Sequence, residues 1–275
     1  MAPAGTRIES ARMAERPNHW FLINSLLDQA QAGGEGLRPN YTWSVLHAAS
    51  VATRTGREAV SVIEFGVAGG NGLVALEGAA AFAQRELGVE VRVYGFDTGG
   101  GLPEPRDHRD APFLMSGGDF PMDVELLRSR LTTAELVLGD VSETIPRFLE
   151  SSHPEIAFIS FDLDYYSSTR DALAILGADA SRLMPRVLCY FDDTHGYPWG
   201  DSNGARLAIA EYNQAGERRK LDRIHGLRHL LPRSQREQRW PEAIYLAHAF
   251  DHPAYNDPEG TELVDRLDLD VEATA

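Results

Sequence analysis

Short apolar runs alternate with longer amphipathic segments along most of the chain. Apolar runs of about four to eight residues are typical of buried strands, whereas apolar residues three and four positions apart are typical of helices. The strands expected on this basis are residues 60–65, 89–96, 136–138, 156–161, 187–191, 221–225 and 243–249. The helices expected between them are residues 72–87, 122–131, 145–149, 168–183 and 204–212.

This alternation predicts an α/β fold with a mostly parallel sheet covered by helices on both faces. No long helix separates the last two strands, so we expect a terminal hairpin that places one antiparallel strand in the sheet. Sheets of this kind bind ligands at the carboxyl ends of their strands. We interpret the chain as one domain, with an N-terminal helical segment (1–58), a catalytic core (59–250) and an acidic tail (251–275). The first segment should hold two helices, within residues 20–54, that cover the site or a partner subunit.

Charge and hydropathy narrow the possible partners. The 275 residues carry a formal net charge of −15, and no basic, aromatic-rich stripe runs through the main body, so nucleic-acid binding is not expected. No apolar stretch is long enough to cross a bilayer, and the N-terminus lacks the apolar core of a signal peptide, which predicts a cytoplasmic protein. The only cysteine, Cys189, should be a small core residue.

One segment, residues 218–239, is rich in arginine despite the acidic whole. A solvated face or a subunit contact would explain it. Alternatively, it forms a pocket wall that accepts an anionic group such as the diphosphate of a nucleotide sugar.

A glycine-rich turn follows the first clear strand. Residues 64–72 read EFGVAGGNG, and four glycines in seven residues allow a sharp turn, a close approach to a ligand and exposure of the amides that begin the next helix. The order of the glycines is not G-x-G-x-x-G, which argues against a nicotinamide-dependent dehydrogenase. A tight turn without a ligand is the other interpretation of this segment.

Two aspartates close the next strands. Asp97 ends the second strand, where a carboxylate can accept hydrogen bonds from both hydroxyls of a ribose. Asp140 follows the third strand and is placed to meet the amino group of an adenine. Capping of the helix that follows is an equally good explanation for Asp140.

Two further strands end in acidic residues, at Asp162 and Asp164 and again at Asp192 and Asp193. Residues two apart in an extended segment point the same way, so Asp162 and Asp164 can share a pocket, and an adjacent strand end would bring the second pair beside them. Carboxylates this close would repel one another unless a cation lay among them. Hard oxygen ligands favour Mg²⁺, with Mn²⁺ or Ca²⁺ as alternatives, over zinc.

Several other side chains could take part in such a site. His195 could act as a base or as a further ligand, although a loop histidine without a role is the more common case. Aromatic residues that could pack on adenine or on a substrate, or belong to the core, are Tyr41, Trp43, Tyr165, Tyr166 and Trp199.

Taken together, these motifs resemble a known group. The turn at 64–72 fits E-x-G-x-x-x-G, the first motif of class I methyltransferases. With the blocks at 95–103, 162–169 and 192–193, it resembles the macrocin O-methyltransferase-like family of sugar O-methyltransferases, in the family's order from about residue 60 to 212. The resemblance implies a Rossmann-like, seven-stranded class I fold, S-adenosylmethionine and Mg²⁺ as cofactors, and methylation of sugar hydroxyls in natural product and antibiotic biosynthesis. A homo-oligomer is also expected.

The resemblance also implies roles for individual residues. The metal ligands would be Asp162, Asp192 and Asp193. Asp164 would be the general base, so Asp164 and Asp162 are the expected catalytic pair. The cofactor site would be lined by Glu64, Gly66, Val67, Ala68, Gly70, Asn71, Asp97, Thr98 and Asp140, with Tyr41 closing over it.

Two other functions are compatible with the motifs. A metal-dependent catechol or phenol O-methyltransferase also uses aspartates and a vicinal diol, but that family usually has Lys after its D-x-D motif, where this chain has Tyr165. The sequence therefore favours an aliphatic hydroxyl on a small-molecule acceptor. A protein that binds S-adenosylmethionine without transferring its methyl group is the second alternative, and an idle acidic cluster that costs stability argues against it.

Overall fold

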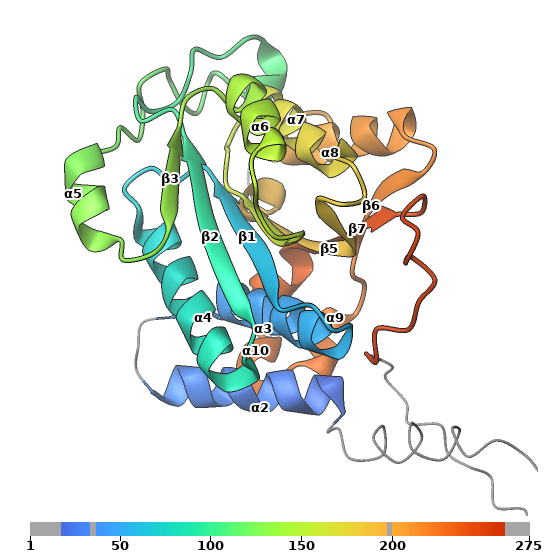
Figure 1. Cartoon of the computed structure of the whole chain (residues 1–275). Helices are drawn as coiled ribbons and strands as arrows, with labels where there is room; N and C mark the ends of the chain where they lie inside the picture. Colours follow the sequence, from blue (N-terminus) through green and yellow to red (C-terminus); the bar gives the residue numbers. More distant parts are fainter. Residues whose placement is uncertain (1–17, 34–36, 197–199, 262–275) are drawn as a thin grey trace, which may run out of the picture.

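A seven-stranded sheet organises the part of the chain that the structure, a computed structural model, describes: residues 18–33, 37–196 and 200–261 (Figure 1). The strands are β1 (Ala59–Phe65), β2 (Glu90–Asp97), β3 (Glu135–Leu138), β4 (Ile156–Phe161), β5 (Leu183–Phe191), β6 (Arg219–Arg223) and β7 (Ile244–Ala249).

Helices occupy most of the connections between these strands. The longer helices are α2 (His19–Ala32), α3 (Pro39–Arg54), α4 (Asn71–Leu87), α5 (Val124–Arg130), α6 (Val141–Glu150), α7 (Tyr166–Ala172) and α8 (Gly204–Ala215). The shorter helices and 3-10 turns are η1 (His108–Asp110), η2 (Leu173–Gly177), η3 (Asp192–Thr194), α9 (Leu227–Leu230), α10 (Arg233–Arg236) and η4 (Trp240–Ala243). Among the helices of the described ranges, none combines the length and apolar character needed to span a membrane.

The strand order confirms the fold class predicted from the sequence. It runs β3-β2-β1-β4-β5-β7-β6. The pairings among the first five strands of this order are parallel, whereas β7 is antiparallel to both of its neighbours, β5 and β6. The order reverses between β1 and β4, which places a ligand crevice at the carboxyl ends of these two strands. This is the Rossmann-like arrangement of class I methyltransferases.

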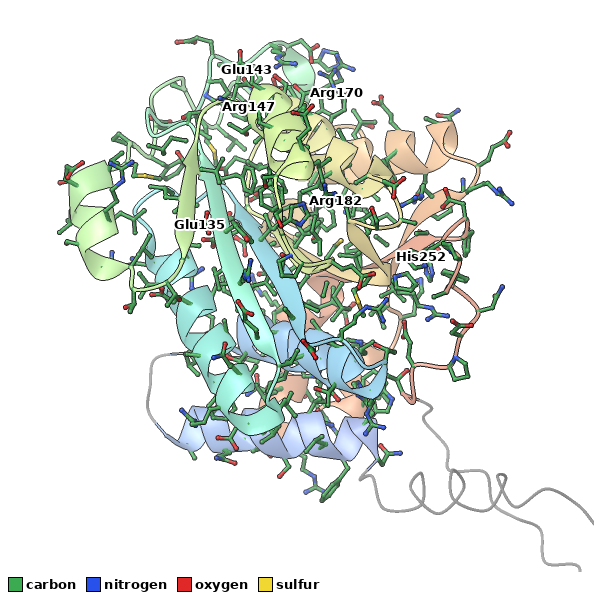
Figure 2. The ribbon with its side chains drawn as sticks, viewed as in Figure 1. Glu135, Glu143, Arg147, Arg170, Arg182 and His252 are labelled. Atoms are coloured by element: carbon green, nitrogen blue, oxygen red, sulfur yellow. The ribbon has the colours of Figure 1, made fainter. Side chains whose placement is uncertain are left out.

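Helices cover both faces of the sheet. On one face α3 packs on β1, β4 and β5, α4 packs on β1 and β2, and α2 lies outside α3; on the other, α6 packs on β2 and is followed by α7 and α8. The sequence of α6 explains its orientation, since Thr144, Ile145 and Phe148 are buried while Glu143 and Arg147 are exposed, as Figure 2 shows for the last two.

The segment between β4 and β5 differs from the expectation. A helix over residues 168–183 and a strand from residue 187 were predicted, but α7 ends at Ala172, η2 replaces its second half, and β5 begins at Leu183. Pro185 lies in the part of β5 that was not predicted, and proline cannot donate to a ladder. The pairing of β4 with β5 shifts its register in this region, from Ile156↔Leu183 to Phe158↔Leu188, which accommodates the proline. Further along β5, Cys189 is fully buried, as predicted.

A pair of histidines, His19 buried and His47 half-buried, joins α2 to α3. His19, 1% exposed, shares a hydrogen bond of 2.8 Å between its Nε2 and Nδ1 of His47, and its Nδ1 lies 3.0 Å from Ser50 Oγ. Burial lowers the pKa of His19 to about 2, with a further contribution from the neighbouring His47, and burial lowers the pKa of His47 to about 4. Both rings are therefore neutral in the folded protein at neutral pH.

This pair should make the fold sensitive to mild acid. Between pH 6.5 and 4 the unfolded chain takes up protons on both imidazoles and the folded chain does not, so the free energy of unfolding falls as the pH falls. Urea unfolding at pH 7 and pH 5 should show that His47→Gln removes about 2 kcal/mol of this loss. His229→Gln, which removes an exposed imidazole, should keep the wild-type difference between the two pH values, and an unchanged pH dependence in His47→Gln would contradict the assignment.

Candidate functional site

Four phenylalanines form a row across the carboxyl ends of the central strands. Phe96, Phe65, Phe161 and Phe191 are paired in register on β2, β1, β4 and β5. Their ring centroids are 4.9, 5.5 and 4.6 Å apart along the row. Each ring belongs to the core, so the residue that follows it in the chain points away from that core.

The residues after these phenylalanines therefore emerge side by side at one edge of the sheet. They are Gly66, Asp97, Asp162 and Asp192. The glycine turn and the acidic strand ends predicted separately from the sequence thus meet because four strands stop at the same level.

The glycine turn passes directly against the end of β4. Gly66 has φ +83° and Gly70 has φ +80°, both in the left-handed region that favours glycine. A Cβ atom on Gly66 would lie 1.6 Å from the backbone oxygen of Asp162. Only glycine at position 66 lets the turn and the first acidic strand end share this space.

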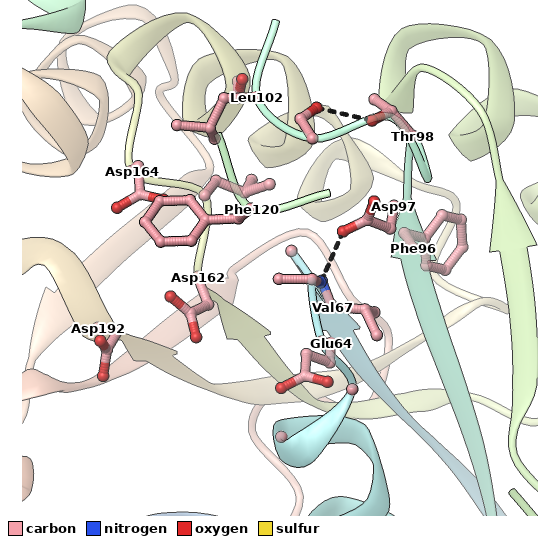
Figure 3. A pocket seen from close by; sticks show the side chains of 18 of the residues that line it. Glu64, Val67, Phe96, Asp97, Thr98, Leu102, Phe120, Asp162, Asp164 and Asp192 are labelled. Atoms are coloured by element: carbon pink, nitrogen blue, oxygen red, sulfur yellow. Dashed lines mark hydrogen bonds between the residues drawn. The ribbon is translucent and has the colours of Figure 1, made fainter. Parts of the chain in front are cut away.

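These elements enclose a cavity of about 350 Å³. Seven carboxylates line it, and Arg38 is the one basic side chain among the described residues of its wall. The acidic residues are Glu64, Asp97, Asp140, Asp162, Asp164, Asp192 and Asp193. Figure 3 shows the carboxylates of Asp162, Asp164 and Asp192 on one side of the cavity and Glu64, Val67 and Asp97 on the other. The cavity thus has an aspartate half and a half built by the glycine turn, residues 64–72.

Glu64 carries an unsatisfied buried oxygen. The side chain is 1% exposed, its Oε1 accepts a hydrogen bond of 2.6 Å from the hydroxyl of Tyr41, and its Oε2 has no partner. Burial raises the pKa of Glu64 to about 8, against the opposing effect of the hydrogen bond from Tyr41. A ligand that brings a positively charged donor to Oε2 would remove this cost.

The expectation that Tyr41 closes over the cofactor does not match its position. Tyr41 is fully buried and is absent from the wall of the cavity. Its hydroxyl lies between Glu64 and Ser160, 3.1 Å from the Oγ of Ser160. Tyr41 therefore supports Glu64 from outside the cavity, with its ring packed against Phe158 and Tyr190.

Asp97 binds the glycine turn itself. Its Oδ2 accepts hydrogen bonds of 2.9 Å from the amides of Val67, as Figure 3 shows, and of Ala68, and its Oδ1 accepts one of 2.7 Å from Gly99. The carboxylate therefore holds two loops together, and Asp97 also lines the cavity. Ribose binding by Asp97 stays a prediction.

Asp140 caps the helix that follows it. Its Oδ1 accepts hydrogen bonds from the amide of Ser142 at 2.8 Å and from the Ser142 hydroxyl at 2.6 Å. The capping interpretation is therefore observed, and because Asp140 also lines the cavity, contact with an adenine is compatible with it.

The aspartate half carries mutually repelling charges. Burial, followed by the charge of Asp192, raises the pKa of Asp162 well above its ordinary value and that of Asp164 to about 6. Burial together with Asp164 and Asp192 raises the pKa of Asp193 to about 7. A bound cation would offset this repulsion.

Asp164 stands at a strained backbone position. Its φ is +57°, a region that non-glycine residues seldom adopt, and the amide of Tyr165 donates to the carbonyl of Leu163 across it at 2.5 Å. The amide of Asp164 donates to Oδ2 of Asp193 at 2.9 Å, which joins the two strand ends. Strain of this kind persists where the surrounding structure enforces it, often at a functional site.

The donor set of the aspartate half suits a hard divalent cation, although its geometry is not preassembled. Among the described residues, no three His, Cys, Asp or Glu side chains converge in a ready-made metal centre. Protein donors engage two of the expected ligands, since Tyr190 donates to Oδ1 of Asp192 at 2.5 Å and the amide of Asp164 donates to Asp193. The other carboxylate oxygens supply the oxygen-only chemistry that Mg²⁺ prefers.

The basic segment and His195, also considered from the sequence, do not line the cavity. No described residue of the basic segment 218–239 lines the cavity. Arg223 and Arg228 pair with Glu242, and Arg219 pairs with Asp251. His195 follows η3 outside the wall of the cavity, and Trp199 lies outside the described residues.

The remaining aromatic residues belong mainly to the core. Trp43 and Tyr165 are fully buried. Tyr166 is also buried, and its hydroxyl donates to Glu211 at 2.6 Å.

Sequence reasoning missed several residues of the wall. They include Arg38 and Phe120. Arg38 comes from the start of α3, and Phe120 comes from the long loop between β2 and α5, so neither neighbours a recognised motif in the chain. Only the fold brings Arg38 and Phe120 to the cavity that the turn at 64–72 also lines.

Comparisons with known proteins return structures and no sequence relatives. No protein-family model matches the chain, and no curated protein is similar enough in sequence to match it. The solved structure of the calicheamicin methyltransferase CalS11 is similar at 23% identity and a TM-score of 0.49, over 71% of this chain and 83% of that one. The O-methyltransferase NovP is similar at 16% identity and a TM-score of 0.48, over 64% and 72%.

A third similar structure is the O-methyltransferase TomG from Streptomyces achromogenes, which is involved in tomaymycin synthesis. It shares 12% identity with a TM-score of 0.43, over 86% of this chain and 91% of its own. At these identities and scores, the function of this chain has to be argued from its own strand order and cavity.

Proposed function

We propose that this protein is an S-adenosylmethionine-dependent O-methyltransferase that uses a divalent cation and acts on a hydroxyl of a small molecule, namely a sugar of a natural product or a nucleotide sugar. The observation that carries the proposal is one cavity with two halves. A glycine turn with an unsatisfied buried Glu64 faces a cluster of four aspartates across it. The first half suits a cationic nucleoside and the second suits a cation with a diol.

The glycine turn supplies the expected cofactor site. S-adenosylmethionine would supply an electrophilic methyl group on its sulfonium. Its positively charged amino group would donate the hydrogen bond that Oε2 of Glu64 lacks. Gly66, Val67, Ala68, Gly70, Asn71 and Thr98 line the same half of the wall. Asp97 and Asp140 would face the ribose and the adenine.

The aspartate half supplies the expected acceptor site. We assign Asp162, Asp192 and Asp193 as the residues that would hold the metal ion, which would supply Lewis-acid chemistry to an acceptor hydroxyl when bound. Asp164 would accept the proton of that hydroxyl at its carboxylate. Burial raises the pKa of Asp164 above its ordinary value, which makes its carboxylate a stronger proton acceptor. The rigid strand ends align the acceptor oxygen with the methyl group.

A radiolabelled methyl-transfer assay tests this proposal. With S-adenosylmethionine and a panel of nucleotide sugars, glycosides and catechol, transfer should occur to a sugar diol, fall by about a hundredfold or more with EDTA and recover with added Mg²⁺. The matched deoxy sugar, which lacks one hydroxyl of the diol, is the control and should not be methylated. Transfer that survives EDTA would overturn the metal assignment, and transfer to catechol alone would favour the aromatic acceptor. Homo-oligomerisation and a role in antibiotic biosynthesis stay predictions.

A further inference from the structure

Phe120 is an unusual residue in the wall of the cavity. Its φ is +59°, which is an outlier for a bulky side chain, and it is 51% exposed. A half-exposed ring gains little from packing within the protein, so burial does not explain why an aromatic residue occupies a strained position. Strain of this kind points to a functional contact.

Backbone hydrogen bonds hold the loop that carries Phe120. The amide of Leu102 donates to the carbonyl of Asp119, and the amide of Gly118 donates to the carbonyl of Leu102, both at 2.8 Å. The amide of Met122 donates to the carbonyl of Gly99 at 3.3 Å. Residue 120 therefore lies between two anchored neighbours, and the loop presents its side chain to the cavity.

The ring lies on the aspartate side of the cavity and across it from Glu64. Phe120 lines the same cavity as Asp162, Asp164 and the glycine turn. Figure 3 shows the ring beside Asp164 and Leu102, on the side of the cavity opposite Glu64. A methyl donor bound to the glycine turn would direct its methyl group toward Asp164, and the ring of Phe120 lies beside Asp164.

We infer that Phe120 is a specificity-determining residue that favours the positively charged sulfonium of the methyl donor over the neutral thioether of the product. An aromatic face attracts a cation within about 6 Å of its centroid and has no comparable attraction for a neutral sulfur. Phe120 would therefore help the product S-adenosylhomocysteine to leave before the next donor binds. The inference rests on the proposed cofactor site.

Isothermal titration calorimetry of the full chain with S-adenosylmethionine and S-adenosylhomocysteine tests this role without turnover. Phe120→Leu keeps an apolar side chain and removes the aromatic face, so it should weaken S-adenosylmethionine binding by roughly three- to thirtyfold and change S-adenosylhomocysteine binding by less than about twofold. Phe120→Tyr keeps the ring and should preserve the wild-type ratio of the two affinities. Phe113→Leu is the matched control, because Phe113 is an exposed phenylalanine of the same loop outside the wall of the cavity.

The possible results separate this inference from the proposed function. Equal weakening of both ligands in Phe120→Leu, or no change in the ratio of their affinities, would overturn the role of Phe120 and leave the cofactor site intact. Failure of the wild-type protein to bind either nucleoside would overturn the cofactor site and the inference together.

Discussion

Asp164→Asn is expected to lower the turnover number by about 10²- to 10⁴-fold, the usual contribution of a positioned general base. The amide has nearly the shape of the carboxylate but cannot accept the proton of the acceptor hydroxyl. The backbone strain at φ +57° and the amide contact with Asp193 do not depend on the carboxylate, so the local fold should persist. Steady-state kinetics combined with calorimetry of S-adenosylhomocysteine and Mg²⁺ binding would measure both effects.

A matched surface change controls for the loss of one negative charge. Asp28 is exposed and lies on α2, away from the cavity, so Asp28→Asn should retain wild-type turnover. If Asp164→Asn instead lost Mg²⁺ binding, Asp164 would be a metal ligand and the base would have to be sought elsewhere.

Gly66→Ala should lower the free energy of unfolding more than alanine at any other glycine of the turn. The new Cβ would lie 1.6 Å from the backbone oxygen of Asp162, and alanine at φ +83° is strained even without that clash. We expect a loss of about 3 kcal/mol or more in the free energy of unfolding, measured with urea. Nucleoside binding should weaken as well, because the turn and the end of β4 have to move apart.

Gly69→Ala provides the control within the same turn. A Cβ at this position meets nothing within 4 Å, and Gly69 has no positive φ. Its stability should change by less than about 0.5 kcal/mol. Equal stability of the two variants would show that the turn is not pressed against β4 as the structure has it.

The sequence predicts the sheet and the acidic edge well because both follow from local patterns. Each central strand carries Phe followed by Gly or Asp at its carboxyl end, and parallel strands paired in register at these phenylalanines present the following residues together. The terminal hairpin was also predictable, since no long helix separates β6 from β7. The break after Ala172 was not predictable, because the 3-10 turn η2 and the register shift around Pro185 depend on how β5 pairs with β4.

The parts of the site that the sequence missed depend on packing. Tyr41 was correctly associated with the site but placed on the wrong side of Glu64, because the direction of its ring is fixed by how α3 packs on the sheet. Phe120 could not be recognised, since its left-handed backbone is imposed by the hydrogen bonds of its loop and has no signature in the residue type.

Calorimetric titration of the purified wild-type protein and of the Glu64→Gln variant with S-adenosylhomocysteine tests the central claim most directly. We predict binding of one nucleoside per chain in the micromolar range, weakened in the variant because the amide cannot pair with the amino group of the ligand as a carboxylate does. Absence of binding to the wild-type protein would contradict the cofactor site at residues 64–72, and the methyltransferase proposal would fall with it.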